Sequence, residues 1–152
     1  LRGDDRRPPR PARRGRDPQA GISNADLDQI RLAQTLLDGR LASVQNQFSP
    51  AFRSSRVELE LCAELGIAFL PWSPLGGIGS AAELGDHYAE NAAIAHERGV
   101  SPQQVALAWE LALSPTVIPI PGSSRPESIL DSVAAASLEL TPDELARLDA
   151  VA

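Results

Sequence analysis

Residues 117–127 read VIPIPGSSRPE, a stretch that combines the pattern of a strand, a turn and a helix start. Its β-branched start predicts a short buried strand. The chain then turns through Pro121 and Gly122 to Arg125, and Pro126 predicts a helix start because its missing N–H is no loss there. This order places backbone N–H groups and a guanidinium around one point, which suits a phosphate. An ordinary strand–helix turn with a surface arginine remains the alternative.

Similar strand–helix units are predicted upstream of this stretch. The first strand is expected to end at residues 21–24. The second and third are expected to cover 41–48 and 67–72, and the fourth to begin at 117–118. The helices are predicted over 27–37, 57–65, 86–97, 102–112, 126–136 and 142–151. Strands that alternate with helices at this length predict βαβ units and a parallel sheet.

Helix starts and one buried face can also be predicted. Ser23 or Asn24 is expected to cap the first helix, and Ser54 or Ser55 the second. Capping boxes are predicted at 101–104 and at 141–144. The helix that follows the first box is expected to turn a core face inward, formed by Val105, Ala108, Trp109 and Ala112.

Polar residues follow the predicted strands in three of the four units. They are Ser23 with Asn24, then Ser73, and finally Ser123 with Arg125, whereas Gln45 lies inside its strand. In folds built from βαβ units, ligands bind at the carboxyl ends of the strands. The sequence therefore predicts a ligand site along that edge of the sheet.

Composition limits the class of protein. The chain has 152 residues, enough for one modest domain, and 43% of them are hydrophobic, but none of its apolar runs could span a bilayer. Cys62 is the one cysteine, so we expect a small buried side chain and a reducing, cytoplasmic compartment. His87 and His96 share no metal-like spacing with carboxylates or cysteine, so no metal site is predicted.

The first 19 residues differ from the remainder. Seven arginines and three aspartates fall within the first 17 residues, and Pro and Gly interrupt any periodicity. Such a segment buries too little apolar surface to fold, so residues 1–19 are predicted to be a disordered head. A basic arm for nucleic acid is a second reading, although no aromatic residue is interleaved for base stacking. A third is translation of GC-rich DNA in a shifted frame.

From residue 21 to residue 150 the chain resembles the C-terminal half of an aldo-keto reductase. The resemblance rests on the order and the gaps of GISN at 21–24, SVQNQFSP at 43–50, GIAFLPWSPLGG at 66–77, SPQQVALAWEL at 101–111, VIPIPGSSRPES at 117–128 and LTPDELARLD at 140–149. It implies an α/β fold, namely the last four strands of an (α/β)₈ TIM barrel, over residues 20–152. It also implies NADP(H)-dependent reduction of carbonyl groups.

The resemblance further implies roles for particular residues. Ser23, Asn24 and Gln45 match residues that hydrogen-bond the nicotinamide carboxamide, and Trp72 matches the aromatic that stacks on its ring. The match extends to a loop over the pyrophosphate at Ser73, Pro74, Leu75 and Gly76, and to the 2′-phosphate site at Gly122, Ser123 and Arg125. Asp131 and Ser132 stand where the family usually has Glu-Asn reading the adenine, and their shorter side chains depart from that pattern.

The catalytic Asp, Tyr, Lys and His of that family come from the first half of the barrel. This chain has no Lys, and its one Tyr, Tyr88, is predicted to lie in a helix after the third strand. We therefore expect a cofactor-binding half that is inactive alone, with a carbonyl substrate bound by the full-length protein and a missing N-terminal barrel half as partner. Exposed sheet edges would promote aggregation, partial order or pairing with that half. A non-catalytic nucleotide-binding or interaction protein is the alternative; nucleic-acid and membrane partners are not expected.

Overall fold

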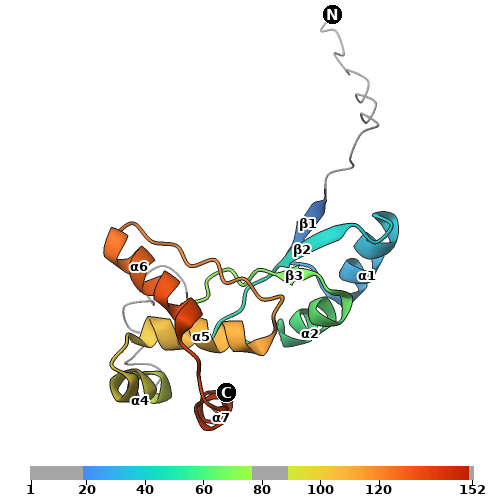
Figure 1. Ribbon diagram of the computed structural model, residues 1–152. Coiled ribbons are helices and arrows are strands. Elements are labelled where there is room, and N and C mark those ends of the chain that lie inside the picture. Colours follow the sequence, from blue (N-terminus) through green and yellow to red (C-terminus); the bar gives the residue numbers. More distant parts are fainter. Residues whose placement is uncertain (1–18, 77–88, 151–152) are drawn as a thin grey trace, which may run out of the picture.

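The computed structural model of the chain describes residues 19–76 and 89–150, and places three short strands beside a curved array of helices (Figure 1). In chain order the elements are β1 (Ala20–Ser23), α1 (Leu27–Leu36), β2 (Leu41–Gln45), α2 (Arg56–Leu65), β3 (Ala68–Phe69), α4 (Ala89–Arg98), α5 (Pro102–Leu113), α6 (Pro126–Ala134), the 3-10 helix η2 (Ala135–Ser137) and α7 (Pro142–Ala150). Residues 1–18 of the predicted head, together with His87 and Tyr88, lie outside the described residues.

The described strands form a parallel sheet in the order β1-β2-β3, as the alternation predicted. The expected fourth strand is an extended segment that forms a single parallel bridge, Phe69 to Val117. Hydrogen bonds nevertheless continue along it, because the Ile118 N–H donates to Phe69 O at 2.8 Å and the Ile120 N–H donates to Pro71 O at 3.2 Å. The order of a parallel α/β sheet is therefore kept through all four units.

Prolines explain why the second half of this sheet is irregular. Pro71, Pro119 and Pro121 carry no N–H, so they cannot return hydrogen bonds to a neighbouring strand. The predicted strand over 67–72 is therefore reduced to β3, although the Trp72 N–H still donates to Asn46 O at 3.0 Å. The predicted strand over 41–48 likewise ends at Gln45.

Helix caps follow the sequence prediction in part. Asp26 caps α1 in a reciprocal box with Gln29, so neither Ser23 nor Asn24 is the cap. Those two side chains bond other strands instead, as described below. Ser55 precedes α2 but makes no side-chain cap bond.

The two predicted capping boxes differ in outcome. Ser101 accepts from the Gln104 N–H at 3.0 Å, but the Gln104 side chain bonds Asp131, so that box is one-sided. The box at α7 is reciprocal. Thr141 Oγ1 accepts from the Glu144 N–H at 3.3 Å, and Glu144 Oε2 accepts from the Thr141 N–H at 2.7 Å.

The core lies between the sheet and the helices that cover it. Val105, Ala108 and Trp109 are buried as predicted, whereas Ala112 is exposed because it lies near the end of α5 on the solvent side. Phe48 stacks on Trp109 with ring centroids 5.7 Å apart and meets Phe69 edge-on at 6.1 Å. Cys62 is fully buried, and desolvation, followed by the charge of Glu58, raises the pKa of its thiol to about 11.

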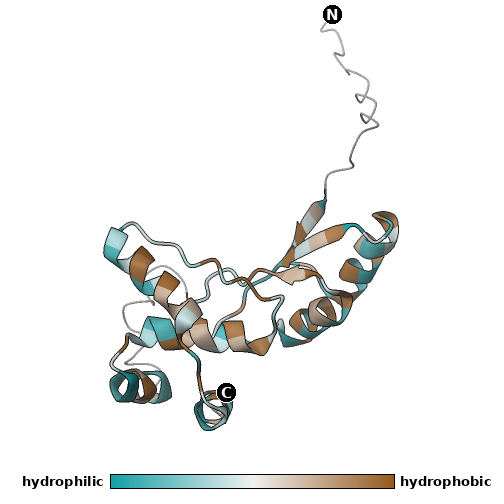
Figure 2. Ribbon diagram, in the orientation of Figure 1, coloured by the Kyte–Doolittle hydropathy of each residue, from teal (hydrophilic) through white to brown (hydrophobic). Residues whose placement is uncertain are grey.

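Large apolar side chains are exposed on α1, on α6 and on the extended segment that contains Ile118. On the α1 side Leu36 is 73% exposed, and on the other side Ile118 is 52% exposed and Leu130 71% exposed. None of the α6 residues is buried, although brown apolar segments alternate with polar ones along the helix (Figure 2). Apolar faces of this extent fit surfaces that another piece of structure covers.

The ion pair between Arg98 and Glu144 makes one acid-sensitive contact. Both Arg98 Nε and Nη2 donate to the Glu144 carboxylate at 2.6 Å, and this pairing, with the Thr141 backbone bond, lowers the Glu144 pKa from 4.5 to about 2. A lowered carboxyl pKa stabilises the fold above pH 4.5, and the stabilisation is lost as the pH falls toward 2.

Glu144→Gln keeps the capping geometry and removes the charge. We expect it to lower the free energy of unfolding at pH 7 by about 1 kcal/mol, and we expect this difference to shrink as the pH falls toward 2. Urea denaturation at a series of pH values measures both quantities. An equal loss at all pH values would show that the charge is not the stabilising element.

Candidate functional site

Three predicted site residues meet where β1 and β2 end. Ser23 and Gln45 are the last residues of these strands and are register partners. The Ser23 hydroxyl donates to the backbone oxygen of Gln45 at 2.8 Å, and the Asn24 N–H donates to the same oxygen at 2.9 Å. Ser23 and Asn24 are exposed and Gln45 is half-buried, so polar groups line this rim.

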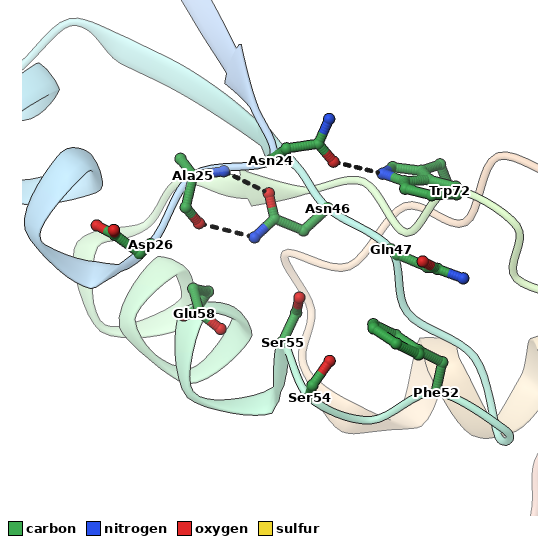
Figure 3. Close-up of a pocket in the computed structure, with 10 residues that line it drawn as sticks. All are labelled: Asn24, Ala25, Asp26, Asn46, Gln47, Phe52, Ser54, Ser55, Glu58 and Trp72. Atoms are coloured by element: carbon green, nitrogen blue, oxygen red, sulfur yellow. Dashed lines mark hydrogen bonds between the residues drawn. The ribbon is translucent and has the colours of Figure 1, made fainter.

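Trp72 joins this group from the segment that follows β3. Its indole Nε1–H donates to Asn24 Oδ1 at 3.0 Å (Figure 3). Asn24 has a φ of 53°, a left-handed conformation that Asn tolerates better than most residues. Ser73, at φ 54°, follows Trp72 and begins a tight turn in which the Gly76 N–H donates to Ser73 O at 2.9 Å. Residues 77–88, which follow this turn, lie outside the described residues.

Asn46 holds this edge together and was not predicted from the sequence. Its side chain is 5% exposed and pairs with the Ala25 backbone: Oδ1 accepts from the Ala25 N–H at 3.0 Å, and Nδ2 donates to Ala25 O at 2.8 Å (Figure 3). The side-chain amide thus imitates a strand neighbour and fixes the chain between β1 and α1. The sequence shows an Asn next to Gln45, which was the available signal. Only the fold shows that this Asn is buried and that its partner is Ala25.

A pocket of about 300 Å³ lies at the same rim. It is lined by Asn24, Ala25, Asp26, Asn46, Gln47, Phe52, Ser54, Ser55, Glu58 and Trp72 (Figure 3). Of these residues, Asn24 and Trp72 were predicted as site residues. The others come from the turn before α1, from the segment between β2 and α2 and, for Glu58, from the first turn of α2. The rim therefore combines hydrogen-bonding groups with an aromatic ring, a combination that ligand sites use to orient a bound molecule.

The predicted phosphate-binding turn lies at the start of α6. Arg125 is exposed at the position before Pro126, and its Nη2 donates to Ser128 Oγ at 3.2 Å. Ser123 Oγ accepts from the Arg125 N–H at 3.2 Å and donates to Arg125 O at 3.0 Å, which shapes the turn. An exposed guanidinium held by a neutral hydroxyl at a helix start fits an anionic group. Gly122 is exposed, with open space beside its Cα.

Asp131 and Ser132 have partners within the protein. Asp131 accepts hydrogen bonds at 2.6 Å from both Ser101 Oγ and Gln104 Nε2, which ties α6 to the start of α5. The Ser132 hydroxyl donates to Ser128 O at 2.9 Å. Because these bonds use both Asp131 oxygens, an adenine-reading role for this pair stays a prediction that the observed contacts do not favour.

No group of three or more His, Cys, Asp or Glu side chains in the described residues could hold a metal ion. Nor is any helix in the described part long and apolar enough to cross a membrane. His96, in the last turn of α4, is exposed.

Comparison with known proteins identifies the family to which the chain belongs. Residues 13–152 match the Aldo/keto reductase family. The chain belongs to the aldo/keto reductase family. It is 36% identical over 129 residues to an uncharacterized oxidoreductase of Schizosaccharomyces pombe, covering 85% of this chain and 40% of that protein. It is 33% identical over 133 residues to pyridoxine 4-dehydrogenase of Escherichia coli, covering 86% and 43%.

Solved aldo/keto reductases share the fold. A structure from Klebsiella pneumoniae in complex with NADPH superposes with a TM-score of 0.76 at 28% identity, covering 86% of this chain and 46% of that one. A second Klebsiella pneumoniae structure, with NADP and acetate, gives the same TM-score at 27% identity and covers 86% and 47%. The chain thus spans less than half the length of these relatives.

Proposed function

We propose that this chain is the C-terminal, cofactor-binding half of an NADP(H)-dependent oxidoreductase that reduces aldehydes or ketones to alcohols. One observation carries the proposal: at one rim, hydrogen bonds that involve the Ser23 hydroxyl, the Asn24 amide and the Trp72 indole join the end of β1 to the end of β2 and to the segment after β3. Asn24 bonds both the end of β2 and the indole of Trp72. Family membership and relatives solved with NADP or NADPH support the same assignment.

The rim supplies the chemistry that a nicotinamide requires. A carboxamide offers one acceptor and two N–H donors, and Ser23, Asn24 and Gln45 carry complementary groups. Trp72 is half-buried, so its ring can cover a flat aromatic ligand while its edge is held by Asn24. The turn from Ser73 to Gly76 would lie over the pyrophosphate.

Arg125 and Ser123 would bind the adenosine 2′-phosphate. A guanidinium presents a rigid fork of donors that matches a phosphate dianion through two parallel hydrogen bonds. The turn at 122–125 adds the start of α6, where backbone N–H groups are free to face an anion. Asp131 and Ser132 are proposed only as neighbours of the adenine.

The missing N-terminal barrel half is the proposed partner of this chain. Eight parallel strands close a barrel of about 250 residues, whereas the described residues of this chain supply three strands and one extended segment. The exposed apolar residues on α1 and α6 support a covering partner. One buried cysteine supports a reducing, cytoplasmic location.

The proposed half lacks the groups that would complete a reduction. When bound, NADPH supplies a hydride to the carbonyl carbon, and a proton donor must stand beside the carbonyl oxygen. This chain's residues hold and orient the nucleotide. The proton donor and the carbonyl-binding surface are assigned to the other half, so the isolated chain is proposed to bind cofactor without turnover.

Arg125→Ala tests the proposed cofactor directly. Because the guanidinium would bond the 2′-phosphate, we expect the NADPH dissociation constant to rise about 10- to 100-fold and that of NADH to change little. Fluorescence titration of each nucleotide measures both constants. Arg31→Ala removes an exposed arginine of α1 and serves as the matched control. An equal loss of affinity for the two nucleotides would show that Arg125 does not bind the 2′-phosphate.

A non-catalytic nucleotide-binding protein is the second candidate, because the rim and the Arg125 turn could hold a nucleotide without any proton donor. It would keep the rim and the Arg125 turn but never gain a proton donor. Reading the coding DNA upstream distinguishes the two functions. Recovery of the family's Asp, Tyr, Lys and His in frame supports the oxidoreductase, and their absence supports the second candidate.

A further inference from the structure

The hydrogen bond between Trp72 and Asn24 has a fixed direction. An indole N–H can only donate, so the atom of the Asn24 amide that faces it must be the oxygen. The amide nitrogen then points away from Trp72, as Figure 3 shows. No hydrogen bond among the described residues uses this nitrogen. Trp72 therefore decides which end of the Asn24 amide is presented at the rim.

The hydrogen bond of the Ser23 hydroxyl also has a fixed direction, but it leaves an acceptor at the rim instead of a donor. Its hydroxyl proton is donated to the Gln45 backbone oxygen at 2.8 Å, so its remaining lone pairs can only accept. The rim thus presents a donor at Asn24 and an acceptor at Ser23, on adjacent residues. A primary carboxamide has the same pair of groups, an acceptor oxygen and a donor nitrogen.

We propose that Trp72 is a positioning residue that sets the donor and acceptor order of the rim, so that Asn24 donates to the carboxamide oxygen and Ser23 accepts from the carboxamide N–H. This inference rests on the proposed function, because it assumes that a nicotinamide binds at the rim. It assigns Trp72 a second role besides covering the ring. It also gives the nucleotide's carboxamide one preferred rotamer.

An analogue of the cofactor separates the two contacts. In the 3-acetylpyridine analogue of NADPH a methyl group replaces the carboxamide NH₂, while the carbonyl oxygen is retained. We expect Asn24→Ala to weaken NADPH and the analogue by a similar factor, about 5- to 10-fold. Ser23→Ala should weaken NADPH by a similar factor and leave the analogue unchanged, because the analogue has no N–H to donate.

Trp72→Phe tests the positioning role itself. Phenylalanine keeps an aromatic face but has no N–H, so the Asn24 amide is free to turn over. We expect Asn24→Ala to cost less than about 2-fold in the Trp72→Phe background, compared with about 5- to 10-fold alone. Far-UV circular dichroism of each variant checks that the fold is kept. A purely structural role for Trp72 would instead weaken both ligands by one common factor and leave the effect of Asn24→Ala unchanged.

Failure of the positioning role can be distinguished from failure of cofactor binding itself. If NADPH binds and Arg125→Ala weakens it, but Asn24→Ala spares the analogue, Asn24 accepts rather than donates and the inference fails alone. Additive effects of Trp72→Phe and Asn24→Ala overturn it in the same way. If the chain binds neither nucleotide, the proposed function fails and the inference fails with it.

Discussion

Trp109→Ala is expected to lower the free energy of unfolding by about 3–5 kcal/mol, a large part of the stability of a domain of this size. Trp109 is 1% exposed and stacks almost parallel to Phe48. The Arg53 guanidinium lies 4.7 Å from the ring centroid, and the indole Nε1–H donates to Asp149 Oδ1 at 2.9 Å. Truncation removes all three contacts and leaves a cavity between α5 and the sheet.

The effect should spread beyond α5 because Arg53 connects the same site to α7. Its Nη1 donates to Asp149 O at 3.1 Å and its Nη2 to Leu148 O at 2.7 Å. Loss of the ring that supports Arg53 would loosen the end of α7 and the segment between β2 and α2. Urea denaturation followed by circular dichroism measures the loss, and amide exchange shows whether α7 opens first.

Two variants make the Trp109 prediction specific. Trp109→Phe keeps an aromatic ring for Phe48 but removes the indole N–H, so we expect a loss of about 1–2 kcal/mol. Trp72→Ala removes the same residue type from a half-buried position at the rim and should cost about 1 kcal/mol or less. Similar losses for Trp109→Ala and Trp72→Ala would contradict a central role for Trp109.

The sequence predicted most helices because their signals are local. The periodicity of apolar residues and the Thr141–Glu144 box lie within one or two turns of chain, so α7 begins where expected. Strand ends were predicted less well. Their length depends on what a neighbouring strand can accept, and the prolines at 71, 119 and 121 remove N–H groups that a regular ladder needs.

The sequence predicted which residues would gather at the rim, but not which hydrogen bonds they would make. Ser23 and Asn24 could be placed at a strand end from the sequence, whereas Gln45 was expected inside a strand that in fact ends at it. That Asn24 would bond Trp72 depends on residues 48 positions apart, whereas the Asp26–Gln29 box that caps α1 is a local signal that was overlooked. Asn46 was missed because its backbone partner Ala25 is brought near by strand pairing.

Glu110→Leu is expected to raise the free energy of unfolding at pH 7 by about 3–5 kcal/mol. Glu110 is fully buried in α5, and neither carboxyl oxygen has a hydrogen-bond partner in the described part of the chain. It belongs to a run of six buried residues, Val105 to Glu110, in a helix that packs against α4, α6 and η2. Leucine fills a similar volume without a polar group to desolvate.

The same carboxyl should make stability depend on pH. Desolvation raises the Glu110 pKa well above its ordinary 4.5, so the folded state holds the proton more tightly than the unfolded state. The stabilisation is complete below pH 4.5 and is lost as the pH rises toward the folded pKa. The free energy of unfolding should therefore fall by about 1.4 kcal/mol per pH unit in that window.

Glu110→Gln separates the charge from the buried polar group. Glutamine is as large and also lacks a partner, but it does not titrate, so the fall in stability above pH 4.5 should disappear while part of the desolvation cost remains. Glu64→Gln, at an exposed position of α2, is the matched control and should leave the pH dependence unchanged. Glu144 acts in the opposite direction, because its stabilisation is lost below pH 4.5. The wild-type chain should then be most stable near pH 4.5, whereas Glu110→Gln should hold its stability up to neutral pH. If the free energy of unfolding falls with equal slope in both proteins above that pH, Glu110 is not the cause.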